Sequence, residues 1–123
     1  VFDDLKGKTL GIYSGYKYHS KIMSMIENAK IKTIKISSLD HGIKLLLLDR
    51  IDALIDFDIL LNYKIKEKYS DSLVLADLYA DEYELFCAYS KKIKTDKVQL
   101  DNVFQSLVVD GEIAKLLKRY HSL

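Results

Sequence analysis

The first seventy residues alternate between two patterns of apolar and polar positions. Strict alternation predicts β-strands over residues 8–13 and 32–36, because successive side chains of a strand point to opposite faces. Apolar residues three or four positions apart predict helices over 16–28 and 39–48. A third strand, buried on both faces, is predicted over residues 51–57, because residues 53–55 at its centre are all apolar. The order is therefore strand, helix, strand, helix, strand.

Individual residues refine these elements. Leu10 and Ile12 should share the inner face of the first strand, and Ile34 and Ile36 should point inward from the second. Ser38 stands where it can cap the second helix, since its hydroxyl can accept a hydrogen bond from a free backbone N–H group.

The second half of the chain is less regular. Residues 59–69 predict a helix, and 73–76 and 83–89 predict two short strands. Residues 96–109 and 112–120 predict two final helices, separated by an Asp-Gly pair. Both carry apolar stripes that need a partner surface, so we expect the isolated chain to self-associate.

The alternation predicts an α/β fold. Each strand–helix–strand step should cross over right-handed, which places the first three strands in one mostly parallel sheet flanked by helices. The 123 residues fit one ordinary domain, and 49% are hydrophobic.

Charge and cysteine content exclude several classes of protein. The formal net charge is +1, with no basic run, which argues against a nucleic-acid partner. Cys87 is the single cysteine, so no internal disulfide can form. No apolar run approaches the length that spans a bilayer.

Catalytic motifs are absent from the sequence. The three histidines, His19, His41 and His121, lack partners at metal-ligand spacing, so we expect no metal site. No nucleophile elbow, P-loop or dinucleotide-binding glycine pattern occurs. We therefore expect a protein with no cofactor that is not an enzyme.

Two segments are candidates for ligand binding, because each follows a strand of the expected sheet. Ser14, Gly15 and Tyr16 connect the first strand to its helix, where free N–H groups can hold an anion. Asp56 and Asp58 flank Phe57 where the third strand ends. The alternatives are an ordinary turn with a serine cap, and a helix start that Asp58 caps or charges.

Four segments follow one another along the chain: DLKGKTLGI at 4–12, SG at 14–15, LDRIDALI at 48–55 and VDGEIAKLLKRY at 109–120. In this order they resemble the second lobe of bacterial solute-binding protein family 3, which has the type II periplasmic binding protein fold. The resemblance implies a three-layer lobe over residues 1–92. It also implies that 93–123 form C-terminal helices that normally pack on a first lobe preceding Val1.

The resemblance implies periplasmic or other extracytoplasmic capture of a small solute by cleft closure. The partner would be the membrane permease of an ABC-type importer. Three alternatives stay open: the sensing domain of a membrane signalling receptor, the regulatory domain of a peptidoglycan lyase, and a plain interaction module.

The chain departs from the family pattern at three positions. Asp49 stands where a glycine is usual. Tyr16 replaces a serine or threonine, and Phe57 occupies the place of the aspartate that grips the ligand's ammonium group in amino-acid binders. These departures predict a flatter or more apolar ligand than an ordinary amino acid, or a cation held over a ring.

Overall fold

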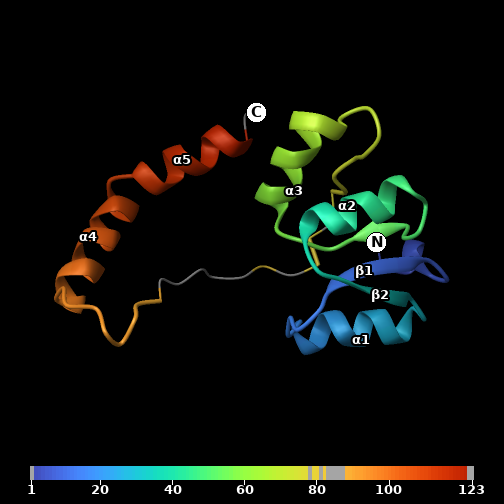
Figure 1. The fold of residues 1–123 in the computed structure, drawn as a ribbon, viewed down its shortest axis with the longest axis horizontal. Helices are drawn as coiled ribbons and strands as arrows, with labels where there is room; N and C mark the ends of the chain where they lie inside the picture. Colours follow the sequence, from blue (N-terminus) through green and yellow to red (C-terminus); the bar gives the residue numbers. More distant parts are fainter. Residues whose placement is uncertain (1, 78, 81, 83–87, 122–123) are drawn as a thin grey trace.

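The computed structural model describes every residue except 1, 78, 81, 83–87 and 122–123. Its elements occur in the order expected of an α/β protein (Figure 1). In chain order they are η1 (Phe2–Leu5), β1 (Thr9–Tyr13), α1 (Ser20–Asn28), β2 (Lys32–Ile36), α2 (Leu39–Leu47), β3 (Ala53–Leu54), α3 (Asp58–Lys64), η2 (Ile65–Tyr69), α4 (Lys97–Val109) and α5 (Glu112–His121).

The three strands form one parallel sheet in the order β2-β1-β3. β1 is central and pairs with β2 along its whole length, from Thr9 opposite Lys32 to Tyr13 opposite Ile36. Its pairing with β3 covers only two positions of β1. The expected α/β class and parallel sheet are confirmed.

One face of the sheet packs against α1. Leu10 and Ile12 of β1 are buried together with Ile22 and Ile26 of α1. The two strand residues are two positions apart and the two helix residues four apart, as expected for one face of a strand and one face of a helix. The buried residues are therefore those that the apolar spacing predicts. This layer is the hydrophobic cluster that anchors the central strand.

The other face packs against α2, which completes three layers (Figure 1). Two glycines allow the close approach. A Cβ atom at Gly42 of α2 would lie 2.9 Å from Cδ1 of Ile36, and one at Gly11 of β1 would lie 2.8 Å from Cδ1 of Ile51. Ile36 and Ile51 are both buried. Ile34, which we expected to point inward like Ile36, is 39% exposed, because β2 lies at one side of the sheet.

β3 is much shorter than the strand predicted over 51–57, and aspartate side chains form hydrogen bonds to the backbone near both of its ends. The Asp52 carboxylate accepts a hydrogen bond from the backbone N–H of Thr9 at 2.8 Å, and the backbone N–H of Asp52 donates to the carbonyl of Thr9 at 2.8 Å. The Asp56 carboxylate accepts from the N–H of Phe57 at 2.7 Å. The bond from Phe57 to Asp56 is local, and local side-chain bonds of this kind compete with the strand ladder.

Helix α2 ends in a left-handed residue. Asp49 has φ of 52°, and the N–H groups of Asp49 and Arg50 donate to the carbonyls of Leu46 and Leu45 at 3.1 and 2.9 Å. This pair of bonds is a Schellman motif, which normally has glycine at the left-handed position. Asp49 therefore occupies a backbone conformation that suits glycine.

Asp49→Gly should raise the free energy of unfolding by about 0.5–1 kcal/mol, because glycine adopts positive φ without the clash of a Cβ atom. Chemical denaturation measures the change. Lys44→Gly, in the interior of the same helix, is the control and should instead destabilise by about 1 kcal/mol. Equal destabilisation by both variants would contradict this account of the helix end.

One strand predicted in the second half needs correction, and another cannot be compared with the structure. Residues 73–76 do not form a strand. Immediately after η2, the N–H of Leu73 donates a hydrogen bond to the carbonyl of Tyr69, and the side chain of Val74 is almost fully exposed. Most of the strand predicted over 83–89 lies outside the described residues.

The last helices confirm the prediction within a residue or two. Asp96 caps α4 by accepting a hydrogen bond from the N–H of Val98 at 2.9 Å. α5 packs against α3, where the rings of Tyr63 and Tyr120 meet edge to face at 5.7 Å, while α4 extends away from the sheet (Figure 1). The following apolar side chains of α4 and α5 are exposed by a third or more: Val98, Val103, Phe104, Leu107, Val108, Val109, Leu116, Leu117 and Tyr120.

Candidate functional site

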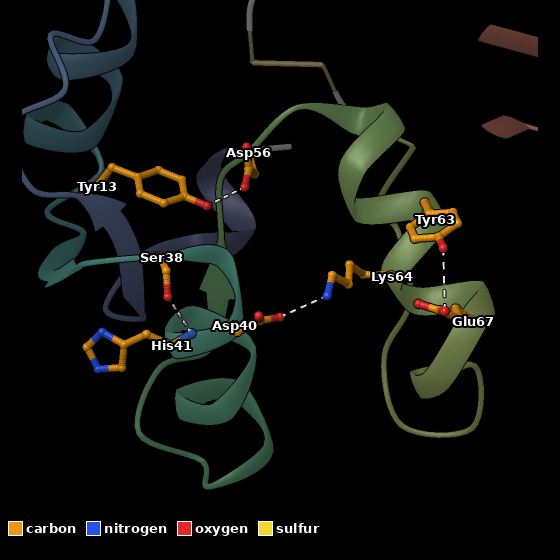
Figure 2. Close-up of polar contacts among 8 residues, drawn as sticks. All are labelled: Tyr13, Ser38, Asp40, His41, Asp56, Tyr63, Lys64 and Glu67. Atoms are coloured by element: carbon orange, nitrogen blue, oxygen red, sulfur yellow. Dashed lines mark hydrogen bonds and ion pairs between the residues drawn. The ribbon is translucent and has the colours of Figure 1, made fainter. Parts of the chain in front are cut away.

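The ends of β1 and β3 meet at the carboxyl end of the sheet. Gly11 lies opposite Leu54 in the parallel register, so Tyr13 and Asp56, two residues further on, arrive side by side. The hydroxyl of Tyr13 donates a hydrogen bond to Oδ2 of Asp56 (Figure 2). Tyr13, which was not among the predicted site residues, thus links the end of the first strand to Asp56.

Tyr13 is held in its neutral form. Its ring is partly buried, and burial raises the pKa of the Tyr13 phenol, with the hydrogen bond to the Asp56 carboxylate as the next cause. A neutral phenol remains a donor, so it can keep its bond to the carboxylate throughout the physiological range. The contact fixes the position of the Asp56 side chain.

The turn after β1 differs from the predicted one. Gly15 has φ of 78°, which explains the glycine at that position. We predicted a helix from residue 16, but α1 begins at Ser20 and His19 is its N-cap, with Nδ1 accepting from the N–H of Lys21 at 3.3 Å. The N–H of Ser14 already donates to the carbonyl of Ile36 at 2.9 Å. An anion site made from a helix start therefore has no geometric basis at Ser14.

Three tyrosine side chains contact one another at this longer turn. The hydroxyl of Tyr18 accepts a hydrogen bond from the backbone N–H of Tyr13 at 2.8 Å and so ends the central strand. The Tyr16 ring lies 5.9 Å from that of Tyr13 and 5.8 Å from that of Tyr18, each pair inclined by 45°. Tyr16 itself is 57% exposed.

The turn after β3 presents one ring and two carboxylates. Phe57 occupies the N-cap position of α3 without a side-chain cap bond, and it is 42% exposed. Asp58 is the first residue of α3, where it adds negative charge to the helix start, and its Oδ1 accepts from the N–H of Ile59 at 2.8 Å. It therefore charges the helix rather than capping it.

The start of α2 is fixed by polar contacts at the same end of the sheet (Figure 2). Ser38 caps this helix as predicted, since its Oγ accepts from the N–H of His41 at 3.1 Å. Asp40 forms an ion pair with Lys64 of α3 at 3.1 Å, and the hydrogen bond to Asp40 raises the pKa of the Lys64 ammonium. Asp40 is largely solvated, so this pair orients α3 more than it stabilises the fold.

Sequence reasoning missed Tyr13 and Tyr18. Tyr13 was read as the last residue of a strand and Tyr18 as part of a helix. The signal that could have found them is the run of tyrosines at 13, 16 and 18 around a glycine turn. Sequence offers no register for a two-residue strand, so the pairing of Tyr13 with Asp56 could not be foreseen.

Other kinds of site find no support in the part of the chain that the structure describes. No group of three or more His, Cys, Asp or Glu side chains is arranged there to hold a metal ion. A hollow lined by Lys21, Tyr79, Ala80 and Glu82 contains none of the predicted site residues. Among the described helices, none has both the length and the hydropathy needed to cross a bilayer.

Comparison with known proteins adds no relative. No family model matches the chain, and no curated protein or solved structure matches it either. The structure shows an α/β fold with a three-stranded parallel sheet, and the likeness to solute-binding proteins is carried by the four sequence segments alone.

Proposed function

We propose that this chain binds a small solute at the carboxyl end of its sheet, as one lobe of an extracytoplasmic solute-binding protein that serves an ABC-type importer. The observation that supports it is the hydrogen bond from Tyr13, the residue before the candidate segment 14–16, to Asp56, the first residue of the candidate segment 56–58. Ligands of open α/β sheets bind beyond the carboxyl ends of the strands.

The four segments of the resemblance fit this proposal where their local structure can be checked. Asp49, in the place of a usual glycine, has a positive φ. Asp52, in the same segment, bonds the N–H of Thr9 and thereby registers β3 on the start of β1. Gly111, in the last segment, has φ of 77° between α4 and α5. These positions are structural and set up the lobe rather than the ligand.

In the proposed mechanism the side chains at the carboxyl end bind and do not catalyse. A second lobe, which the resemblance implies, closes over this end and supplies the other wall of the cleft. One lobe alone should bind weakly, because half of the contacts are then missing.

Nuclear magnetic resonance of the ¹⁵N-labelled chain tests the proposal. The chain is titrated with a panel of small polar solutes that includes amino acids, organic cations, organic anions and sugars. We expect at least one solute to shift the amide signals of Ser14, Gly15 and Phe57.

The opposite end of the sheet is the internal control. Gly7 and Arg50 lie there, at the starts of β1 and β3, and their amide signals should stay unchanged. Shifts confined to that end, or no shift with any solute, would contradict the proposed function.

A further inference from the structure

Three tyrosine rings lie close together at the carboxyl end of β1. Tyr13, Tyr16 and Tyr18 form a continuous ring-to-ring cluster with centroid distances of 5.9 and 5.8 Å. Tyr16 is the most exposed of the three, so one side of the cluster meets solvent. Tyrosine ring faces carry negative potential and attract cations.

A carboxylate adjoins these rings. Asp56 accepts one hydrogen bond at each oxygen, from the Tyr13 hydroxyl and from the N–H of Phe57, which leaves further lone pairs on both atoms. Within the described part of the chain no lysine or arginine forms an ion pair with Asp56 or Asp58. Among the described residues, the charges of Asp56 and Asp58 are thus not neutralised by an ion pair.

Two backbone N–H groups beside the Gly15 turn are already engaged and cannot serve an anion. The N–H of Tyr13 is bonded to the Tyr18 hydroxyl and that of Ser14 to the carbonyl of Ile36. α1 starts only at Ser20, so its free N–H groups do not begin at the Gly15 turn. Lys17 is the single basic side chain within residues 14–18.

We propose that the tyrosine–aspartate cluster, defined as Tyr13, Tyr16, Tyr18 and Asp56, binds an organic cation that has no carboxylate group. This inference rests on the proposed function and specifies its ligand class. The rings contact the apolar surface of the cation, and Asp56 balances its charge. Tyr13 acts as a positioning residue, because its hydroxyl holds the carboxylate beside the rings.

Choline and its neutral isostere 3,3-dimethylbutan-1-ol test the charge requirement. They have nearly the same shape, so a difference in affinity reports the charge. In titrations of the chain followed by the amide signals of residues 14–16 and 56–58, choline should bind at least about fivefold more tightly. Trimethylglycine, which has a carboxylate in place of the hydroxymethyl group of choline, should bind more weakly than choline.

Variants assign the effect to the cluster. Asp56→Asn keeps an acceptor for Tyr13 but removes the charge, and should weaken choline binding by about tenfold. Tyr16→Leu should weaken it by about threefold. The control Asp49→Asn removes a carboxylate at the opposite end of the sheet and should leave choline affinity unchanged.

The outcomes separate the two proposals. Equal binding of choline and its isostere, tighter binding of trimethylglycine, or choline binding unaffected by Asp56→Asn would overturn the cation proposal while solute binding at this end still stands. If no solute of the panel shifts signals at this end of the sheet, both proposals fail.

Discussion

Ile12→Ala should lower the free energy of unfolding by about 2–5 kcal/mol, the largest effect we expect from a single substitution. Ile12 lies in the central strand, is 2% exposed and belongs to the cluster that joins β1 to α1. Removing its side chain from a close-packed interior leaves a cavity that neighbours on both elements fill only in part. Denaturation by urea measures the change.

Ile34→Ala is the matched control for this substitution. Ile34 lies on the neighbouring strand β2 but is 39% exposed, so the same truncation should cost about 1 kcal/mol or less. If Ile12→Ala does not fold, Ile12→Val, which should cost about 0.5–1.5 kcal/mol, keeps the comparison measurable. Equal costs at positions 12 and 34 would contradict the assigned core.

Tyr13→Phe should lower the free energy of unfolding by about 1–2 kcal/mol at neutral pH, because it deletes a hydrogen bond to a charged group that is only partly buried. The folded protein raises the pKa of Tyr13 above its unfolded value. The stabilisation is therefore complete below the unfolded pKa of about 10 and is lost as the pH rises above it.

Parallel unfolding curves at several pH values check this dependence. The difference between wild type and Tyr13→Phe should stay constant from pH 6 to 9 and shrink above about pH 10. Tyr79→Phe removes the hydroxyl of a largely exposed tyrosine and should change stability by less than about 0.5 kcal/mol. A difference that persists unchanged at high pH would show that the lost stability does not come from the phenol proton.

Sequence patterns predicted the elements that depend on local periodicity. β2 and α2 were placed within a residue, and the buried positions Leu10, Ile12 and Ile36 followed from the alternation. The α/β class follows from the order of these elements. Here the local preference and the tertiary contacts agree.

The predictions failed at two places where the local structure departs from a regular α-helix. The helix predicted over 16–28 begins only at Ser20, and the Tyr18 hydroxyl instead accepts a hydrogen bond from the N–H of Tyr13. Residues 59–69 were predicted as one regular helix, but the chain changes to a π-helix at Ile65. Apolar spacing carries no information on either effect.

The sequence predicted the two segments of the candidate site, 14–16 and 56–58, but not the hydrogen bond between Tyr13 and Asp56. The carboxyl ends of parallel strands lie at the same edge of a sheet, so the placement of both segments at one end of the sheet could be argued from sequence. The bond between Tyr13 and Asp56 needs the register of β3, which is set by Asp52 on Thr9 rather than by a long ladder. Thr9 and Asp52 are 43 residues apart in sequence, so local patterns do not predict this contact.

The lateral position of β2 has a consequence for association between molecules. In the described part of the chain only β1 pairs with β2, so its other side presents unpaired backbone groups that could template a foreign strand. Lys32 and Lys35 are both exposed on this strand. Adding a strand there would crowd and desolvate their ammonium groups, and this protects the five-residue strand against edge-to-edge aggregation.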